Sequence, residues 1–268
     1  MLRKGSEATV LRLYHFPAAI CAQKNRICLA EKGVPWDSVD ARNLLRTPEY
    51  LKLNPAGYAP TLVHDDRVIT ESRIISEYLD ESFGGPSLQP RNSYGRAVMR
   101  SWSKQVDDSL HGTIFLLSFV PFSDELRRSK SEEELLKMLP LDIQKRERAM
   151  NMLQFGYQSP YILPALQRIQ KLISDMQATL SQTKWLAGES YTLADADLTP
   201  YLQRLTDLGL DWLWEDRAAV AAWFDRVKQR PSFSAVKKDW FTETELERSA
   251  IGAKQVGPRF RELLTATV

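Results

Sequence analysis

The sequence has little that could support a disulfide framework. Its 268 residues include only two cysteines, Cys21 and Cys28. They lie seven residues apart within one helical pattern, so two turns of helix separate them by roughly 10 Å, too far for a disulfide bond. We therefore expect reduced thiols and a cytoplasmic protein.

Long apolar runs and an excess of one charge are also missing. No run of 18 apolar residues occurs, and the opening MLRKGSEATV lacks the apolar core of a secretory signal peptide. The 36 Lys and Arg against 34 Asp and Glu leave a net charge of +2. We therefore expect neither a membrane nor nucleic acid as a partner. The sequence also offers no metal-ligand cluster, nucleotide-binding loop or Ser-His-Asp pattern that would predict those chemistries.

The first 84 residues carry alternating strand and helix patterns. Short apolar runs predict strands, and apolar residues at helical spacing predict helices, the first of which Gly33 ends. The predicted order is β-α-β-α-β-β-α, with strands at Leu11–Phe16, Trp36–Val39, Thr61–Val63 and Arg67–Ile69, and helices at Cys21–Lys32, Thr47–Leu53 and after Ser72.

The segment Asn54–Asp80, NPAGYAPTLVHDDRVITESRIISEYLD, holds the clearest candidate binding site. Pro60 opens its first strand, and a cis X-Pro bond, which costs only ~0.5–1 kcal/mol, can turn a strand end toward a ligand. Glu71 and Ser72 stand where the next helix begins. The free N–H groups and dipole of a helix N-terminus favour a ligand carboxylate there.

Beyond the turn-rich linker Gly84–Ser93 the patterns are helical throughout. Thr192 and Asp195 form a capping box that predicts the start of one helix. Helical periodicity predicts others over Arg96–Phe119, Leu135–Leu153 with a break at Pro140, Pro164–Leu180 and Ala218–Gln229. An α/β first domain is thus followed by an all-helical second domain.

These motifs resemble the cytosolic glutathione transferase superfamily over roughly residues 10–240. Its Asn-Pro-x-Gly-x-x-Pro and Glu-Ser patterns, and the motif read here as LAGESYTLADADL, are all present. The scaffold looks closest to the bacterial β-aryl etherase type. The resemblance implies a thioredoxin-like glutathione-binding domain (βαβαββα) at residues 10–84, an all-α substrate-binding domain at 92–245 and a C-terminal extension at 246–268.

The resemblance also implies glutathione as co-substrate and assigns residues to it. Tyr58 and Ala59, ahead of a cis Pro60, would offer their loop to the cysteinyl part, and Glu71 with Ser72 would hold the γ-glutamyl end. A cation for a glutathione carboxylate is expected before the second helix. The candidates there are Arg42 and Arg46, with Arg46 preferred.

The usual thiol activators of that superfamily are absent. Ala19 stands at the serine position, and His15 stands at the tyrosine position. Cys21 resembles the cysteine of the bacterial beta class, and His111, in SLHGTIFLLSF, resembles its histidine, so the resemblance implies these two as catalytic. The alternative is that Cys21 is a small core residue and His111 a helix-surface residue.

The resemblance therefore predicts a detoxification-type transferase in which glutathione thiolate attacks a hydrophobic, aromatic electrophile. Cleavage of β-aryl ethers is the preferred subclass, and a homodimer is expected. Two alternatives stay open: a Cys-dependent thiol transferase or disulfide reductase, and a non-catalytic ligand-binding module. Four aromatic residues line either an acceptor pocket or the core: Trp102, Phe115, Phe119 and Tyr157.

Overall fold

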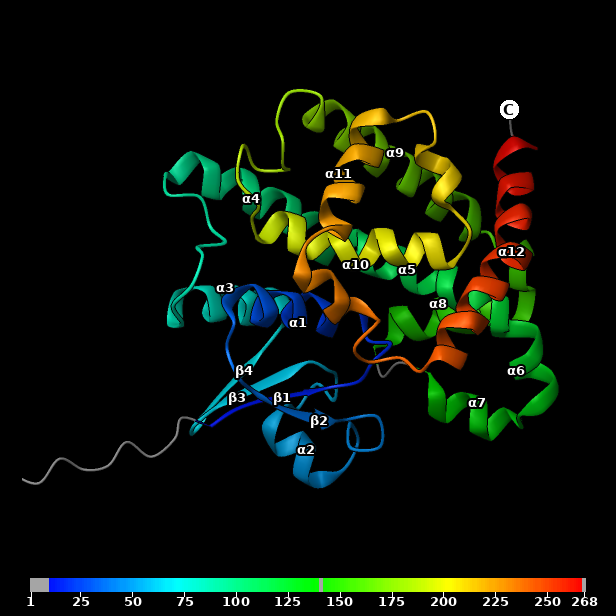
Figure 1. The fold of residues 1–268 in the computed structure, drawn as a ribbon. Helices are drawn as coiled ribbons and strands as arrows, with labels where there is room; N and C mark the ends of the chain where they lie inside the picture. The colour runs from blue at the N-terminus through cyan, green and yellow to red at the C-terminus, as the bar shows by residue number, and fades with distance from the viewer. Residues whose placement is uncertain (1–9, 140–141, 267–268) are drawn as a thin grey trace, which may run out of the picture.

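The structure is a computed structural model that describes residues 10–139 and 142–266. Its chain forms a small mixed sheet with flanking helices, and then a larger helical part (Figure 1). The elements before residue 83 are β1 (Leu11–His15), α1 (Ile20–Lys32), β2 (Asp37–Asp40), α2 (Pro48–Leu53), β3 (Thr61–His64), β4 (Arg67–Thr70) and α3 (Ser72–Ser82).

The four strands are arranged in the order β2-β1-β3-β4. β1 pairs in parallel with β2 and antiparallel with β3, and β3 forms a hairpin with β4. Leu13 and Leu62, which face each other across β1 and β3, are fully buried. The predicted β-α-β-α-β-β-α order and the thioredoxin-like fold are therefore confirmed.

Helices α1 and α3 cover the face of the sheet that is turned toward the helical part, and α2 lies on the opposite face (Figure 1). α1 ends at Gly33, whose φ of 64° is a left-handed conformation that glycine adopts without strain. Ile75 and Leu79 of α3 share one buried stripe, as their helical spacing predicts.

The helical part differs in two places from the predicted boundaries. The single helix expected at Arg96–Phe119 is α4 (Ser93–Gln105) and α5 (His111–Phe119), joined by a π-helical turn, η1 (Val106–Leu110). The helix expected over Leu135–Leu153 with a break is two helices with different outer ends, α7 (Glu132–Met138) and α8 (Ile143–Phe155). The predicted break at Pro140 lies outside the described residues.

The remaining elements complete the second part. They are α6 (Ser123–Ser129), α9 (Ile162–Leu180), α10 (Leu193–Asp207), α11 (Ala218–Lys228) and α12 (Glu243–Thr265), with 3-10 turns η2 (Val120–Phe122), η3 (Gly156–Gln158), η4 (Asp211–Trp214) and η5 (Pro231–Val236). Among the residues described, no helix combines the length and apolar character needed to cross a membrane.

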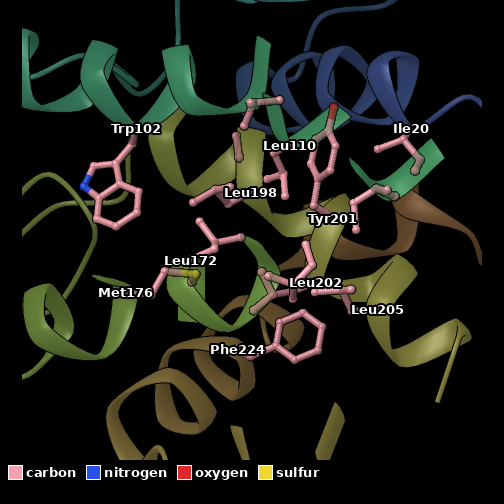
Figure 2. Packing of buried hydrophobic residues seen from close by; sticks show 14 of the residues in the cluster. Ile20, Trp102, Leu110, Leu172, Met176, Leu198, Tyr201, Leu202, Leu205 and Phe224 are labelled. Carbon is pink, nitrogen blue, oxygen red and sulfur yellow. The ribbon is translucent and has the colours of Figure 1, made fainter. Parts of the chain in front are cut away.

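Helix α10 runs through the middle of one hydrophobic core that continues to the face of the sheet covered by α1 and α3. Leu198, Leu202 and Leu205 pack there against α9 and α11, and the Tyr201 hydroxyl points toward α1 (Figure 2). The capping box predicted at the start of α10 is present. The buried Asp195 carboxylate accepts hydrogen bonds from the N–H groups of Thr192 and Leu186 and from the Trp223 indole.

The C-terminal helix α12 packs against α9 and α10. Its Gly257 lies against Gly209, in the turn that follows α10. A Cβ on Gly257 would overlap the backbone of that turn, and a Cβ on Gly209 would overlap the backbone of α12. The two glycines therefore let the backbones touch, and the tail is part of the helical core.

Candidate functional site

The candidate site is built around Cys21, in the first turn of α1. The chain runs from β1 through a short loop that ends before Ile20. This loop places the Cys21 thiol between the sheet and the helical part. Cys21 Sγ lies 3.4 Å from His111 Nδ1, although the two residues are 90 positions apart in sequence. The two predicted catalytic residues are thus brought together.

The surroundings of Cys21 favour its thiolate. Burial alone would raise the pKa of the thiol, but positive charge on His111 and Lys24, with hydrogen bonds from His111 and Tyr201, lowers it from about 9 to about 7. The thiolate in turn raises the pKa of His111 against the opposing effect of burial. Such a pair can hold a thiolate and an imidazolium at neutral pH.

Tyr201 is a third member of this centre that the sequence did not reveal. Its hydroxyl lies 3.2 Å from His111 Nδ1 and 3.9 Å from Cys21 Sγ. Burial keeps the pKa of the phenol well above its ordinary value, so the group stays protonated and can donate. In the sequence Tyr201 looks like one more apolar residue of a core helix, and only its position opposite α1 gives it a role.

The loop before β3 has the expected conformation and a polar support. The Ala59–Pro60 peptide bond is cis. The carbonyl oxygen of Tyr58, just before this bond, accepts hydrogen bonds from Tyr50 Oη at 2.7 Å and from Asn54 Nδ2 at 2.9 Å. These two buried side chains fix the loop, while the Tyr58 ring is 42% exposed.

Glu71 and Ser72 stand at the N-terminus of α3, as predicted. Glu71 has a φ of 67°, a left-handed conformation that costs about 1–3 kcal/mol for a residue with a side chain. Asn25 of α1 donates to the Ser72 carbonyl at 2.7 Å and to Ser76 Oγ at 2.8 Å, and so ties the start of α3 to the helix that carries Cys21. The strained residue thus lies where the resemblance places the γ-glutamyl group.

The two candidate cations have different surroundings. Arg46 donates to the carbonyl of Leu139 at 3.0 Å and so links the sheet domain to the end of α7. Arg42 is exposed and forms a bidentate pair with Asp40, with Nε–O distances of 3.1 and 2.9 Å. Arg46 is therefore held near the junction of the two parts, and Arg42 is neutralised by its neighbour.

His15 is part of the core of the domain. It is 1% exposed, and its ring contacts Ser38 Oγ at 2.9 Å and Arg26 Nη1 at 3.2 Å. Burial and the Arg26 charge lower the pKa of His15 to about 4, so the ring is neutral. Ala19 is the N-cap of α1 and has no side-chain donor. Neither position can therefore stabilise a thiolate.

Two aromatic side chains follow His111 on the same face of α5. Phe115 and Phe119 follow at intervals of four residues, and their rings stack with centroids 5.8 Å apart. Phe115 is 38% exposed, whereas Phe119 packs against a small apolar cluster beneath α8. Of the other predicted pocket residues, Trp102 is buried in the core and Tyr157 packs on Phe260.

A cavity lies elsewhere in the molecule. It has a volume of about 400 Å³, and its lining includes Lys228, Arg230 and Lys237 but neither Cys21 nor His111. Each of these three cations already has a carboxylate partner, on Asp225, Glu31 and Asp207 respectively. Among the residues described, no group of three His, Cys, Asp or Glu side chains is placed to hold a metal ion.

Two sequence profiles match the chain. One, described as glutathione S-transferase, N-terminal domain, matches residues 13–87. The other, described as glutathione S-transferase, C-terminal domain, matches residues 113–231. Together they cover both the sheet part and most of the helical part, including Cys21 and Tyr201.

Individual relatives agree with these profiles. Protein LigF of Sphingobium sp. strain SYK-6 is 28% identical over 252 residues, which cover 88% of this chain and 95% of LigF. Tetrachloro-p-hydroquinone reductive dehalogenase of Sphingobium chlorophenolicum is 28% identical over 84% of this chain and 94% of its own. The crystal structure described as beta-etherase LigF matches with a TM-score of 0.75 at 25% identity, over 85% of this chain and 98% of that one.

Proposed function

We propose, because the chain belongs to the glutathione S-transferase family, that it is a glutathione transferase whose own Cys21 thiolate exchanges disulfides with glutathione. The family uses glutathione as co-substrate, and this chain is an enzyme of that kind. The finer assignment to Cys21 depends on one observation above all, the 3.4 Å contact between its Sγ and His111 Nδ1 in the first turn of α1.

The proposed reaction has two displacement steps. In the first, Cys21 thiolate attacks the glutathione sulfur of a mixed disulfide between glutathione and a second thiol, and that thiol leaves with a proton from His111. In the second, the thiolate of a free glutathione attacks the Cys21–glutathione disulfide and releases glutathione disulfide. The second thiol leaves in its reduced form, and the one free glutathione is oxidised as it joins the glutathione carried by Cys21. The proton of that free glutathione restores His111, and Cys21 returns to its thiolate.

Binding of glutathione would use the residues inferred from the sequence. Ala59 would offer its backbone to the cysteinyl part, and Glu71 and Ser72 would hold the γ-glutamyl end at the N-terminus of α3. Arg46 would bring a positive charge toward the glycyl carboxylate. The ordered supports of these positions, described above, favour a preformed site, because little conformational entropy is then lost on binding.

The test is mass spectrometry of the protein after incubation with glutathione disulfide. We expect one added glutathione per chain in the wild type, on Cys21. We expect no added glutathione in Cys21→Ala. Cys28→Ala is the matched control, since the Cys28 thiol is fully buried and burial raises its pKa far above the ordinary value. An unmodified Cys21 after prolonged incubation would refute the proposal.

Glutathione-dependent cleavage of an aryl ether is the second candidate. The exposed Phe115 beside His111 favours it, as does the similarity to a protein described as beta-etherase LigF. Glutathione thiolate would attack the carbon that carries the ether oxygen, and His111 would protonate the departing phenoxide. A Cys21→Ala variant that still cleaves a β-aryl ether but no longer exchanges disulfides would favour this reaction.

The expected homodimer belongs to the same proposal. Exposed apolar side chains occur on β4, on α3 and in the first turn of α4: Val68, Ile74 and Tyr94 are 42%, 57% and 79% exposed. A surface of this kind is consistent with an interface. Sedimentation analysis of the wild type and of Ile74→Arg tests it, with a dimer expected only for the wild type.

A further inference from the structure

Lys24 has so far been named only as one charge near Cys21, and the buried ion pair that it forms with Asp197 has no role in the reaction as described. Lys24 lies one turn after Cys21 on α1, and its side chain is 0% exposed. Its Nζ is 3.7 Å from Oδ1 of Asp197, whose side chain is 1% exposed, and 3.9 Å from Oδ1 of the half-exposed Asp107. Within the described part of the chain, neither Nζ nor the two Asp197 oxygens has a hydrogen bond of good geometry.

Such an arrangement contributes little to folding. Removing two charges from water costs several kcal/mol per ion, and the loss is offset only by close contact and further hydrogen bonds. The same helix contains a pair that meets those conditions. Lys32 Nζ lies 2.9 Å from Asp80 Oδ1 and also donates to the carbonyls of Asp80 and Pro86. The looser Lys24 pair therefore needs another explanation.

The contact between α1 and α10 explains why the Lys24–Asp197 pair is present. Cys21 and Lys24 are three residues apart on α1, and Asp197 and Tyr201 are four apart on α10, so each pair shares one helix face. The two faces meet in two adjacent layers, Cys21 with Tyr201 and Lys24 with Asp197. The ammonium therefore lies directly behind the thiol, shielded from water and only partly neutralised.

We propose that Lys24 is a positioning residue for Cys21: its buried ammonium is a fixed positive charge that holds the sulfur as a thiolate, and Asp197 limits the strength of that charge. The inference rests on the proposed role of Cys21 in the reaction. It adds a second source of positive charge, independent of His111, which must give up its proton during the first displacement step.

Ionisable groups from several elements surround Cys21 and Lys24. Around the thiol itself stand His111 of α5, Tyr201 of α10 and Lys24 of α1. Around Lys24 stand Asp197, Asp107 of η1 and, beyond Asp107, Arg73 of α3, whose Nη1 lies 3.9 Å from the Asp107 carboxylate. Lys145 of α8 is near enough to lower the pKa of His111 slightly. Among the residues that the structure describes, only Lys24 combines full burial with a positive charge next to Cys21.

Substitutions at the two ends of the pair should have opposite effects. Lys24→Met keeps the aliphatic stem and removes the charge, so the thiolate should become harder to form. Asp197→Asn removes the opposing charge, while Asp107 keeps Lys24 protonated, so the thiolate should become easier to form. A merely structural role would shift both variants in the same direction. This difference in sign separates an electrostatic effect from damage to the fold.

The measurement is the rate of Cys21 alkylation by iodoacetamide from pH 5 to 10, followed on tryptic peptides. Trypsin cleaves after Arg26, so Cys21 and Cys28 fall in different peptides even without Lys24. We expect the wild-type midpoint near pH 7 to rise by about one pH unit in Lys24→Met and to fall by about half a unit in Asp197→Asn. Lys24→Arg should stay close to the wild type.

Lys32→Met is the matched control, because it breaks a buried pair at the far end of the same helix. It should unfold at a lower temperature and leave the Cys21 midpoint unchanged. If Lys24→Met does not fold, Asp197→Asn and Lys24→Arg still decide the question. Unchanged midpoints in the folded variants, or shifts of the same sign in Lys24→Met and Asp197→Asn, overturn the inference. Shifts of opposite sign without any Cys21–glutathione disulfide would instead support the inference and refute the proposed reaction.

Discussion

Replacement of His111 by asparagine should slow disulfide exchange at Cys21 by an amount that the structure sets. His111 Nδ1 contacts the sulfur at 3.4 Å, and its charge and hydrogen bond are the largest favourable contributions to the thiolate. Without them, the pKa of Cys21 should return from about 7 to its ordinary value of about 9 or above, because burial then acts against the charged form.

Two opposing effects determine the size of the change. At pH 7 the thiolate population falls from one half to about one hundredth, a loss of about fiftyfold. A thiolate of higher pKa is also a better nucleophile. With a Brønsted coefficient of about 0.4–0.5, a pKa that is two units higher increases the rate constant of the thiolate about six- to tenfold. The rate of attack on glutathione disulfide should therefore fall about five- to eightfold at pH 7.

The assay is stopped-flow reaction with glutathione disulfide between pH 5.5 and 9.5. The rate of the variant should exceed that of the wild type above about pH 8, because the greater nucleophilicity of its thiolate there outweighs its smaller thiolate fraction. His64→Asn is the control, because His64 hydrogen-bonds to Tyr78 Oη and pairs with Leu11, at the opposite end of β1 from the loop that leads to Cys21. An unchanged pH profile in His111→Asn would show that the Cys21–His111 contact does not control the thiol.

Three further predictions concern the same architecture. Ser72→Ala should raise the dissociation constant of glutathione by about ten- to 150-fold in calorimetry, because a lost hydrogen bond to a charged group is worth about 1.5–3 kcal/mol. Asp195→Ala should lower the free energy of unfolding by about 3–5 kcal/mol in urea denaturation, since it leaves the buried Trp223 indole and two backbone donors unpaired. Tyr201→Phe should keep the fold and slow Cys21 alkylation below pH 7, because the phenol donor that it removes increases the thiolate fraction of Cys21. The alkylation rate above pH 9 should not change, because the thiol is then ionised with or without that donor.

Local patterns determined the elements and their order. Strand alternation, the Gly33 stop and the Thr192–Asp195 capping box are short-range signals, and the structure contains all three features. Boundaries were less certain where the chain departs from regular geometry. A helical pattern continues unbroken through Val106–Leu110, so periodicity could not reveal that one π-helical turn lies there.

The candidate site was visible in the sequence only where it is local. Ala59–Pro60 and Glu71–Ser72 are neighbours in the chain, and turn and helix-start chemistry identifies them. The pairing of Cys21 with His111 came from the resemblance to a family. Nothing in either helix alone predicts a contact across 90 residues.

Tertiary structure alone decided which charges and hydroxyls surround the thiol. Tyr201, Lys24 and Asp197 belong to helices whose sequences predict only a core and an ordinary charged face. They become a site because α1 and α10 cross at one point, where burial removes water and makes each charge act strongly on its neighbours. The sequence by itself thus determined the fold, the family and the candidate loops for glutathione, whereas long-range packing determined the surroundings that control the ionisation of Cys21.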